Sequence, residues 1–187
     1  LTWGQLVAST MALFRLSFRI IFRRKLLFMA AGILVFYAIV YTVAVYEPFG
    51  GFAASEALLV LVELPGTILA IYLAMDLVAR ERNRNTLETL FSTASSHYAI
   101  WVVRMLSVYL VLAATLLAMS TLAYFTFAEF PYFWGGLNAF LPAFLIANMT
   151  FFLSIYCRSA NTAGMLSVGV LIIVLITSEN LEETNFY

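Results

Sequence analysis

Three polar side chains fall inside otherwise apolar stretches of this chain: Glu63, Asn138 and Asn148. A carboxyl group inside a hydrophobic segment is costly to bury, so Glu63 is by default a candidate for contact with a cationic substrate or a proton. The structural interpretation is favoured over this one: Glu63 stays protonated or wetted near the membrane interface and only orients its helix. Asn138 and Asn148 are further candidates for a substrate path, although amides inside such segments more often hold helices together.

The chain lacks the residue sets of several other kinds of site. One histidine (His97) and one cysteine (Cys157) cannot form a zinc site, and a bis-histidine haem needs a second imidazole. No Gly-rich phosphate-binding loop occurs, so any ATP that drives this protein must bind to another chain. No serine, histidine or paired-carboxylate constellation converges within the apolar stretches. We therefore expect no catalytic residue, metal or cofactor in this chain, and no nucleic-acid partner.

Composition predicts an integral membrane protein. Of the 187 residues, 64% are hydrophobic and 11% are charged, whereas about a quarter are charged in a typical soluble domain. Apolar stretches recur that are long enough, at ~1.5 Å per residue, to cross a ~30 Å hydrocarbon core. The spans that we expect are 26–46, 57–79, 98–127, 137–157 and 163–178. The predicted fold is all-α, a single transmembrane domain over 1–187 with five visible transmembrane helices.

Local features predict how these spans bend and pack. Pro65 removes a backbone donor and Gly66 loosens the turn, so we expect a kink there. Small residues recur at every fourth position in two spans, which suits close contact with another helix. These rows are Gly66, Ala70 and Ala74 in one span, and Ala139, Ala143 and Ala147 in another. The aromatic stretch 129–136, which ends in two glycines, predicts an interfacial belt with a turn.

The distribution of charge predicts the orientation. All ten Lys and Arg residues lie in the first 25 residues, in the polar stretch 80–104 or at Arg158. Segments 47–56, 129–136 and 179–187 contain no basic residue and hold six of the ten acids. Because basic segments stay on the cytoplasmic side, the N-terminus, 80–104 and the turn at Arg158 are predicted to be cytoplasmic. The membrane that we expect is the plasma membrane, the inner membrane of a bacterium.

Residues 1–25 predict an amphipathic helix that lies in the membrane interface. Basic residues recur beside an aromatic and aliphatic arc, so their charged groups can meet the head groups of membrane lipid. The alternative is a long cytoplasmic start to the first span, anchored by its last three basic residues. The basic residues concerned are Arg15, Arg19, Arg23, Arg24 and Lys25.

The polar stretch after the second span predicts a short helix at 80–97. Asn85 can act as its N-cap, with Glu88 three residues later in a variant of the capping box. Leu87, Leu90 and Phe91 then share one face. Such a helix, held at the membrane surface between two spans, suits contact with a partner protein. The alternative is a cytoplasmic loop whose apolar side chains dip into the lipid interface.

The run from Glu81 to Thr93 reads Glu-Arg-Asn-Arg-Asn-Thr-Leu-Glu-Thr-Leu-Phe-Ser-Thr. It resembles the signature of type-2 ATP-binding-cassette (ABC) exporter permeases, roughly Glu-Arg-x-x-Gly-Thr-Leu-Glu-x-Leu-Leu-x-Thr-Pro. In that family the signature links the second and third spans and forms the coupling helix against the ATPase. Asn85 stands where the family usually has Gly, a mild departure because Asn is the next-best residue for capping or left-handed conformations. Ala94 stands where Pro is frequent, so the serines that follow Phe91 must stop the helix instead.

The resemblance implies a function and its partners. The chain would be the transmembrane permease subunit of an ABC exporter, coupling ATP hydrolysis by separate ATPase subunits to substrate movement. ATP and Mg²⁺ would be held by those ATPase subunits, and a second permease chain, identical or different, would complete the pathway. The family also has an interfacial elbow helix where 1–25 lies, and six spans, so we expect a sixth span beyond this chain. The implied coupling residues are Glu81, Arg82, Thr86, Leu87, Glu88, Leu90 and Phe91.

Two other functions stay open on the residues alone. The chain could be a non-transporting membrane-anchor subunit of a larger membrane complex. It could also be a channel or secondary transporter, although no two spans show the matched charged or broken-helix symmetry of inverted repeats. Copurification of an ATPase would separate these functions from that of a permease.

Overall fold

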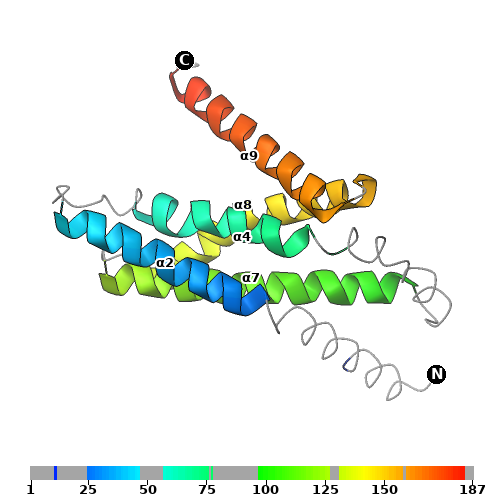
Figure 1. Ribbon diagram of the computed structural model, residues 1–187, viewed down its shortest axis with the longest axis horizontal. Helices are drawn as coiled ribbons and strands as arrows, with labels where there is room; N and C mark the ends of the chain where they lie inside the picture. The colour runs from blue at the N-terminus through cyan, green and yellow to red at the C-terminus, as the bar shows by residue number, and fades with distance from the viewer. Residues whose placement is uncertain are drawn as a thin grey trace.

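The computed structural model describes residues 11, 25–46, 57–75, 77, 97–126, 131–157 and 159–183. Over these ranges the chain is almost entirely helical and contains no strand, so the predicted all-α fold is confirmed there (Figure 1). The elements are α2 (Lys25–Tyr46), the π-helical segment η1 (Leu59–Glu63), α4 (Leu64–Ala74), α7 (His97–Thr126), α8 (Tyr132–Tyr156) and α9 (Ala160–Glu183).

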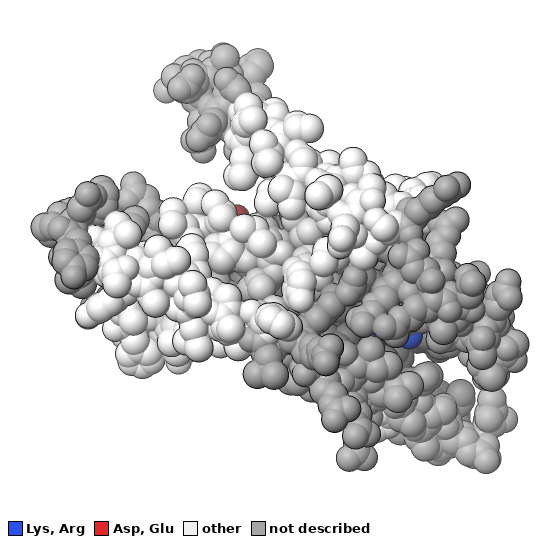
Figure 2. Space-filling model, in the orientation of Figure 1, with Lys and Arg blue, Asp and Glu red and all other residues white. Residues whose placement is uncertain are grey.

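Three of the described helices are long and apolar enough to cross a membrane: Trp101–Thr126, Tyr132–Tyr156 and Ala160–Thr177. Phe28–Val43 and Leu59–Ala74 are shorter apolar helices. The described part of the surface in Figure 2 is almost free of charge. Large apolar side chains point outward from it, and Phe125 and Met165 are each 77% exposed. A surface of this kind is suited to lipid as its solvent.

Helices that follow one another along the chain run in alternating directions (Figure 1). The Ser154 hydroxyl donates a hydrogen bond of 3.0 Å to the Met75 carbonyl, so the end of α4 lies beside the end of α8. The rings of Trp101 and Phe151 are 6.2 Å apart, so the start of α7 lies there too. Figure 1 shows the start of α2 on the same side of the bundle. We call this the basic end, because Lys25 begins α2 there.

Helix α8 is central, and it faces its neighbours with small residues. Its buried positions form one stripe: Gly135, Gly136, Ala139, Ala143, Ala147, Thr150 and Ser154. A Cβ on Gly136 would lie 2.9 Å from a methyl group and 3.3 Å from the Cα of Leu117, so glycine permits α7 to approach this closely. The row from Gly66 to Ala74 on α4 is buried as well. The close contacts predicted for both small-residue rows are therefore confirmed.

Two helix boundaries differ from the sequence-based expectation. Helix α8 begins at Tyr132, whereas the span was expected to begin at 137, so Gly135 and Gly136 lie inside the helix. Their lack of a side chain serves close packing rather than a turn. Helix α9 runs from Ala160 to Glu183, so the helix includes acidic residues expected in a tail beyond the last span.

The second apolar segment changes its helical geometry just before Pro65. The Leu64 N–H donates to the Leu59 carbonyl, which is the i to i−5 pattern of a π-helix. Proline has no N–H, so the Leu61 carbonyl lacks the donor that an α-helix would supply from position 65. The irregularity predicted at Pro65 is therefore present, as a π-helical turn that leads into α4.

A tyrosine from α2 reaches this irregular turn. The Tyr37 hydroxyl lies 3.0 Å from the Leu61 carbonyl and 3.0 Å from the Met119 carbonyl on α7, and its single proton is shared between them. Its side chain is only 8% exposed. One hydroxyl thus joins α2, η1 and α7 in the interior, where a carbonyl without a donor is costly.

We expect Tyr37→Phe to lower the free energy of unfolding by ~1–3 kcal/mol, because the Leu61 carbonyl would remain buried without its donor. Pro65→Ala restores a backbone N–H at the position that can serve this carbonyl. Tyr37→Phe should therefore cost less in the Pro65→Ala background. Unfolding in mixed micelles with increasing SDS, followed by circular dichroism, measures both values.

Tyr132→Phe is the matched control for the lost hydroxyl, since Tyr132 is 50% exposed at the start of α8. It should leave the free energy of unfolding within ~0.5 kcal/mol of the parent value. If Tyr37→Phe lowers the free energy of unfolding equally in the parent chain and in the Pro65→Ala background, the hydroxyl does not replace the backbone donor that Pro65 lacks.

Candidate functional site

The predicted coupling residues lie outside the described part of the chain. They are Glu81, Arg82, Thr86, Leu87, Glu88, Leu90 and Phe91. The elbow residues Arg15, Arg19, Arg23 and Arg24 also lie outside it, and Lys25 is the first residue of α2. What the structure describes is the pair of helices that hold the segment after Leu77 and before His97.

Both of these helices attach to the last turns of α8. Met75 is the C-cap residue of α4, and the carbonyls at a helix end are those that need partners from outside the helix. The Ser154 hydroxyl supplies that partner at 3.0 Å. One turn earlier on α8, the ring of Phe151 packs against Trp101 near the start of α7. The same part of α8 therefore contacts both the helix before and the helix after the segment 81–93.

Trp101 also contacts a charge. The guanidinium carbon of Arg104 lies 5.8 Å from the centre of the Trp101 ring, within the range of a cation–π interaction. Val103 and Ser107 are buried against the bundle, and Val102 is 63% exposed. Tryptophan with a cationic partner at a helix start is typical of a membrane interface. This arrangement sets how α7 is rotated where the polar segment joins it.

The predicted substrate-path residues are not brought together at one level. Helices α4 and α8 run in the same direction from η1 and Tyr132 to their joined ends. At ~1.5 Å per residue, Glu63 and Pro142 are both about 18 Å from those ends, Asn138 is ~6 Å further away, and Asn148 is ~9 Å nearer. The structure thus separates Asn138 and Asn148 along α8, with the level of Glu63 between them.

Asn148 holds two helices together. Its side-chain oxygen accepts a hydrogen bond of 2.6 Å from the Tyr109 hydroxyl on α7, and its amide donates to the Phe144 carbonyl at 2.8 Å. The Tyr109 ring also packs on Phe144, with 4.8 Å between ring centres. Of the two roles considered for Asn148, the contacts support packing.

Within the described part of the chain, Glu63 and Asn138 are not engaged in an interhelical hydrogen bond of the kind that Asn148 makes. Glu63 is half-buried at the last position of η1, and its carboxyl makes no capping hydrogen bond to α4. Asn138 is exposed on α8. Among the described residues, no group of three or more potential metal-ligating side chains occurs.

Sequence reasoning considered an interhelical role for Asn148 but missed Ser154. Ser154 bonds across to α4, whereas Ser107 and Ser167 are equally buried and bond to carbonyls of their own helices. Nothing in the local sequence separates one serine from the others. The difference comes from the fold, which places the Met75 carbonyl at the end of α4 within reach of Ser154.

Comparisons of this chain with protein-family models, curated proteins and solved structures found no match. A functional proposal therefore depends on the resemblance of the sequence from Glu81 to Thr93 to the exporter signature, and on the contacts of the helices that flank it.

We expect Ser154→Ala to loosen the end of α4, because the Met75 carbonyl loses its donor at a cost of ~1 kcal/mol. Amide hydrogen exchange at 71–75 should become about fivefold faster, the factor that corresponds to this free energy. Ser167→Ala is the control, since that buried hydroxyl bonds within α9. Unchanged exchange at 71–75 in Ser154→Ala would show that the hydrogen bond does not hold the helix end.

Proposed function

We propose that this chain is the permease subunit of an ABC transporter, an exporter in which separate ATPase subunits drive substrate across the membrane. One observation carries the proposal: the helix ends on both sides of the exporter-like segment are anchored to the same turns of α8. A loop that only connects two spans does not need such a mounting. A segment that receives force from a partner does, because the force must reach the helices without being lost in local bending.

The proposed mechanism is a rigid-body movement. Leu87, Leu90 and Phe91 would fill an apolar groove on the ATPase, while Glu81 and Arg82 fix the register. Closure of the ATPase dimer around ATP would then move the docked segment, and with it the helices that hold it. Glu88 and Thr86 would complete the contact with the ATPase.

The contacts among α4, α7 and α8 support movement as one block. The two helix ends are tied to α8 by a hydrogen bond and by ring packing. Further along, the hydrogen bond between Tyr109 and Asn148 joins α7 to α8 within the apolar interior. The small-residue stripe brings backbones close, and closely packed interfaces transmit displacement rather than absorb it.

The membrane layout that we propose has an interfacial helix over 1–25, five spans and a coupling helix between the second and third. The basic end faces the cytoplasm of a bacterial cell. The alternating helix directions support this layout, because they bring the boundaries of the basic segments to one end of the bundle. A second permease chain and membrane lipid would cover the exposed apolar faces, and Glu63 is the first candidate for the substrate path.

The orientation can be measured by labelling with a membrane-impermeant maleimide. In a Cys157→Ser background, which removes the one native cysteine, Tyr132→Cys should react in intact cells. Asn83→Cys should react only after the membrane is permeabilised, since the basic segments lie inside. Labelling of Asn83→Cys from outside would contradict both the orientation and the coupling role.

Docking on the ATPase can be tested with the double variant Leu90→Ala/Phe91→Ala. Burial of a Leu or Phe side chain contributes ~1.5–3 kcal/mol, so loss of both should weaken ATPase binding by several kcal/mol if both are fully buried in the interface. The variant should insert into the membrane normally but lose its ATPase partner during purification. Quantitative mass spectrometry of the purified complex gives the ratio of the two chains.

Leu145→Ala/Phe152→Ala is the matched control, because these α8 side chains are 67% and 56% exposed along the apolar surface. The ATPase should stay bound in this variant. If Leu90→Ala/Phe91→Ala also retains the parent ratio and parent ATP hydrolysis, the coupling-helix proposal is wrong. If no ATPase copurifies with the parent chain, the membrane-anchor function is favoured instead.

A further inference from the structure

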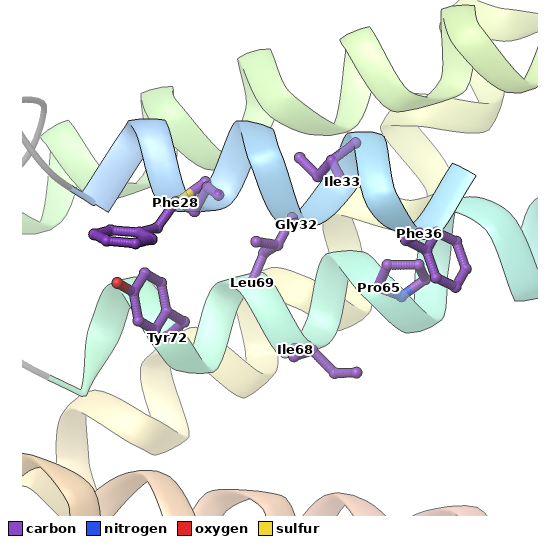
Figure 3. Close-up of a pocket in the computed structure, with 9 residues that line it drawn as sticks. Phe28, Gly32, Ile33, Phe36, Pro65, Ile68, Leu69 and Tyr72 are labelled. Carbon is purple, nitrogen blue, oxygen red and sulfur yellow. The ribbon is translucent and has the colours of Figure 1, made fainter. Parts of the chain in front are cut away.

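An apolar groove of about 490 Å³ runs between α2 and α4. Figure 3 shows the rings of Phe28 and Tyr72 at one end of it, and Phe36 with Pro65 at the other. Between these ends Gly32 lies on the α2 side with Met29 and Ile33, opposite side chains of α4. The groove follows α2 for about two turns, or ~12 Å.

Gly32 lines the groove and faces outward from α2. A Cβ built on Gly32 would find no atom within 4 Å, so the space beside it is empty of the described side chains. Close helix packing does not account for this glycine, in contrast to Gly136, where a Cβ would meet Leu117 at 2.9 Å. At Gly32 no described helix packs against the α2 backbone, so the space beside it is open.

The size of the groove restricts what can enter it. An α-helix with its side chains is ~10 Å across, so a 12 Å length of helix would need about 900 Å³. The groove offers about half of that volume. A single hydrocarbon chain is narrower than a helix and matches the apolar lining.

Charge is placed at one end of the groove. Lys25 precedes Phe28 and Gly32 by three and seven positions, so it occupies the same face of α2 as they do. In the sequence it directly follows Arg23 and Arg24. The groove is therefore lined by apolar residues, and a basic residue, Lys25, precedes its Phe28 end along α2.

We propose that this groove binds one acyl chain of an anionic phospholipid, whose head group is held at the basic start of α2. The cationic position complements the phosphate and any further negative charge of the head group, and the apolar lining complements the chain. The proposal depends only on a membrane location and not on the transporter function. A lipid in this place would fill the space between α2 and α4.

Photocrosslinking in vesicles tests the site directly. The full chain is reconstituted in phosphatidylglycerol and phosphatidylethanolamine, with a trace of either lipid carrying a photoreactive group in its acyl chain. Crosslinks mapped by mass spectrometry should fall on the groove residues Phe28, Gly32 and Leu69. The yield should be higher with the anionic probe than with the zwitterionic probe.

Gly32→Leu should lower the groove crosslinks about tenfold, because its side chain displaces roughly two methylene groups of the lipid chain. Gly32→Ala should lower them less, and it keeps the test valid if the larger side chain disturbs folding. Gly169→Leu is the matched control, since a Cβ on Gly169 in α9 also finds no atom within 4 Å. Lys25→Gln should reduce the preference for the anionic probe about fivefold, the factor expected for one basic residue near an anionic surface.

Three results would overturn the proposal. Equal groove crosslinking in the Gly32 variants and in Gly169→Leu would show that no chain occupies the space beside Gly32. Equal crosslinking yields from the anionic and the zwitterionic probe in the parent chain would show that the site does not select an anionic head group. Crosslinks of the groove to residues 1–24 or to a second copy of the chain, found with a residue-based crosslinker placed at Gly32, would assign the groove to protein.

Discussion

The carbonyl of Leu61 is the constraint around which the described helices are arranged. Pro65 takes away its helical donor, and Leu61 is fully buried, so water does not reach this carbonyl to replace the donor. The donor comes instead from Tyr37, whose hydroxyl also lies 3.0 Å from the Met119 carbonyl. Satisfying one backbone group therefore fixes the rotation of α2 and its height against η1 and α7. An apolar contact at the same place would permit sliding, whereas a hydrogen bond between defined atoms does not.

The same physical rule explains why α8 is central. Lipid is as apolar as leucine, so helices in a membrane gain little from burying large side chains against one another. The gain comes from close backbone approach and from polar groups that find partners. Helix α8 provides the first with its stripe of glycine and alanine, and the second through Ser154 and Asn148. At the other end of the helix, the Ser120 hydroxyl of α7 donates to the Tyr132 carbonyl at 2.6 Å.

What the sequence predicted well has a local cause. The irregular turn at Pro65 follows from one missing N–H, and the small-residue rows follow from their spacing along a helix. The partner of the Leu61 carbonyl could not be predicted, because Tyr37 is one of ten tyrosines and lies 24 positions away. The start of α8 at Tyr132 rather than 137 could not be predicted, because the glycines at 135–136 fit a turn and a close helix contact equally well. Only Leu117, brought against the second glycine by the fold, decides between the two.

These contacts divide the described bundle into a tightly joined part and a looser one. Helices α4, α7 and α8 share small-residue packing and hydrogen bonds at both ends of α8. Helix α2 is mostly exposed, with Leu34 at 64% and Val35 at 58%, and an open groove separates much of it from α4. A force applied between α4 and α7 would therefore move the three joined helices together. Helix α2 is joined to this block through the Tyr37 hydroxyl, which bonds to both η1 and α7.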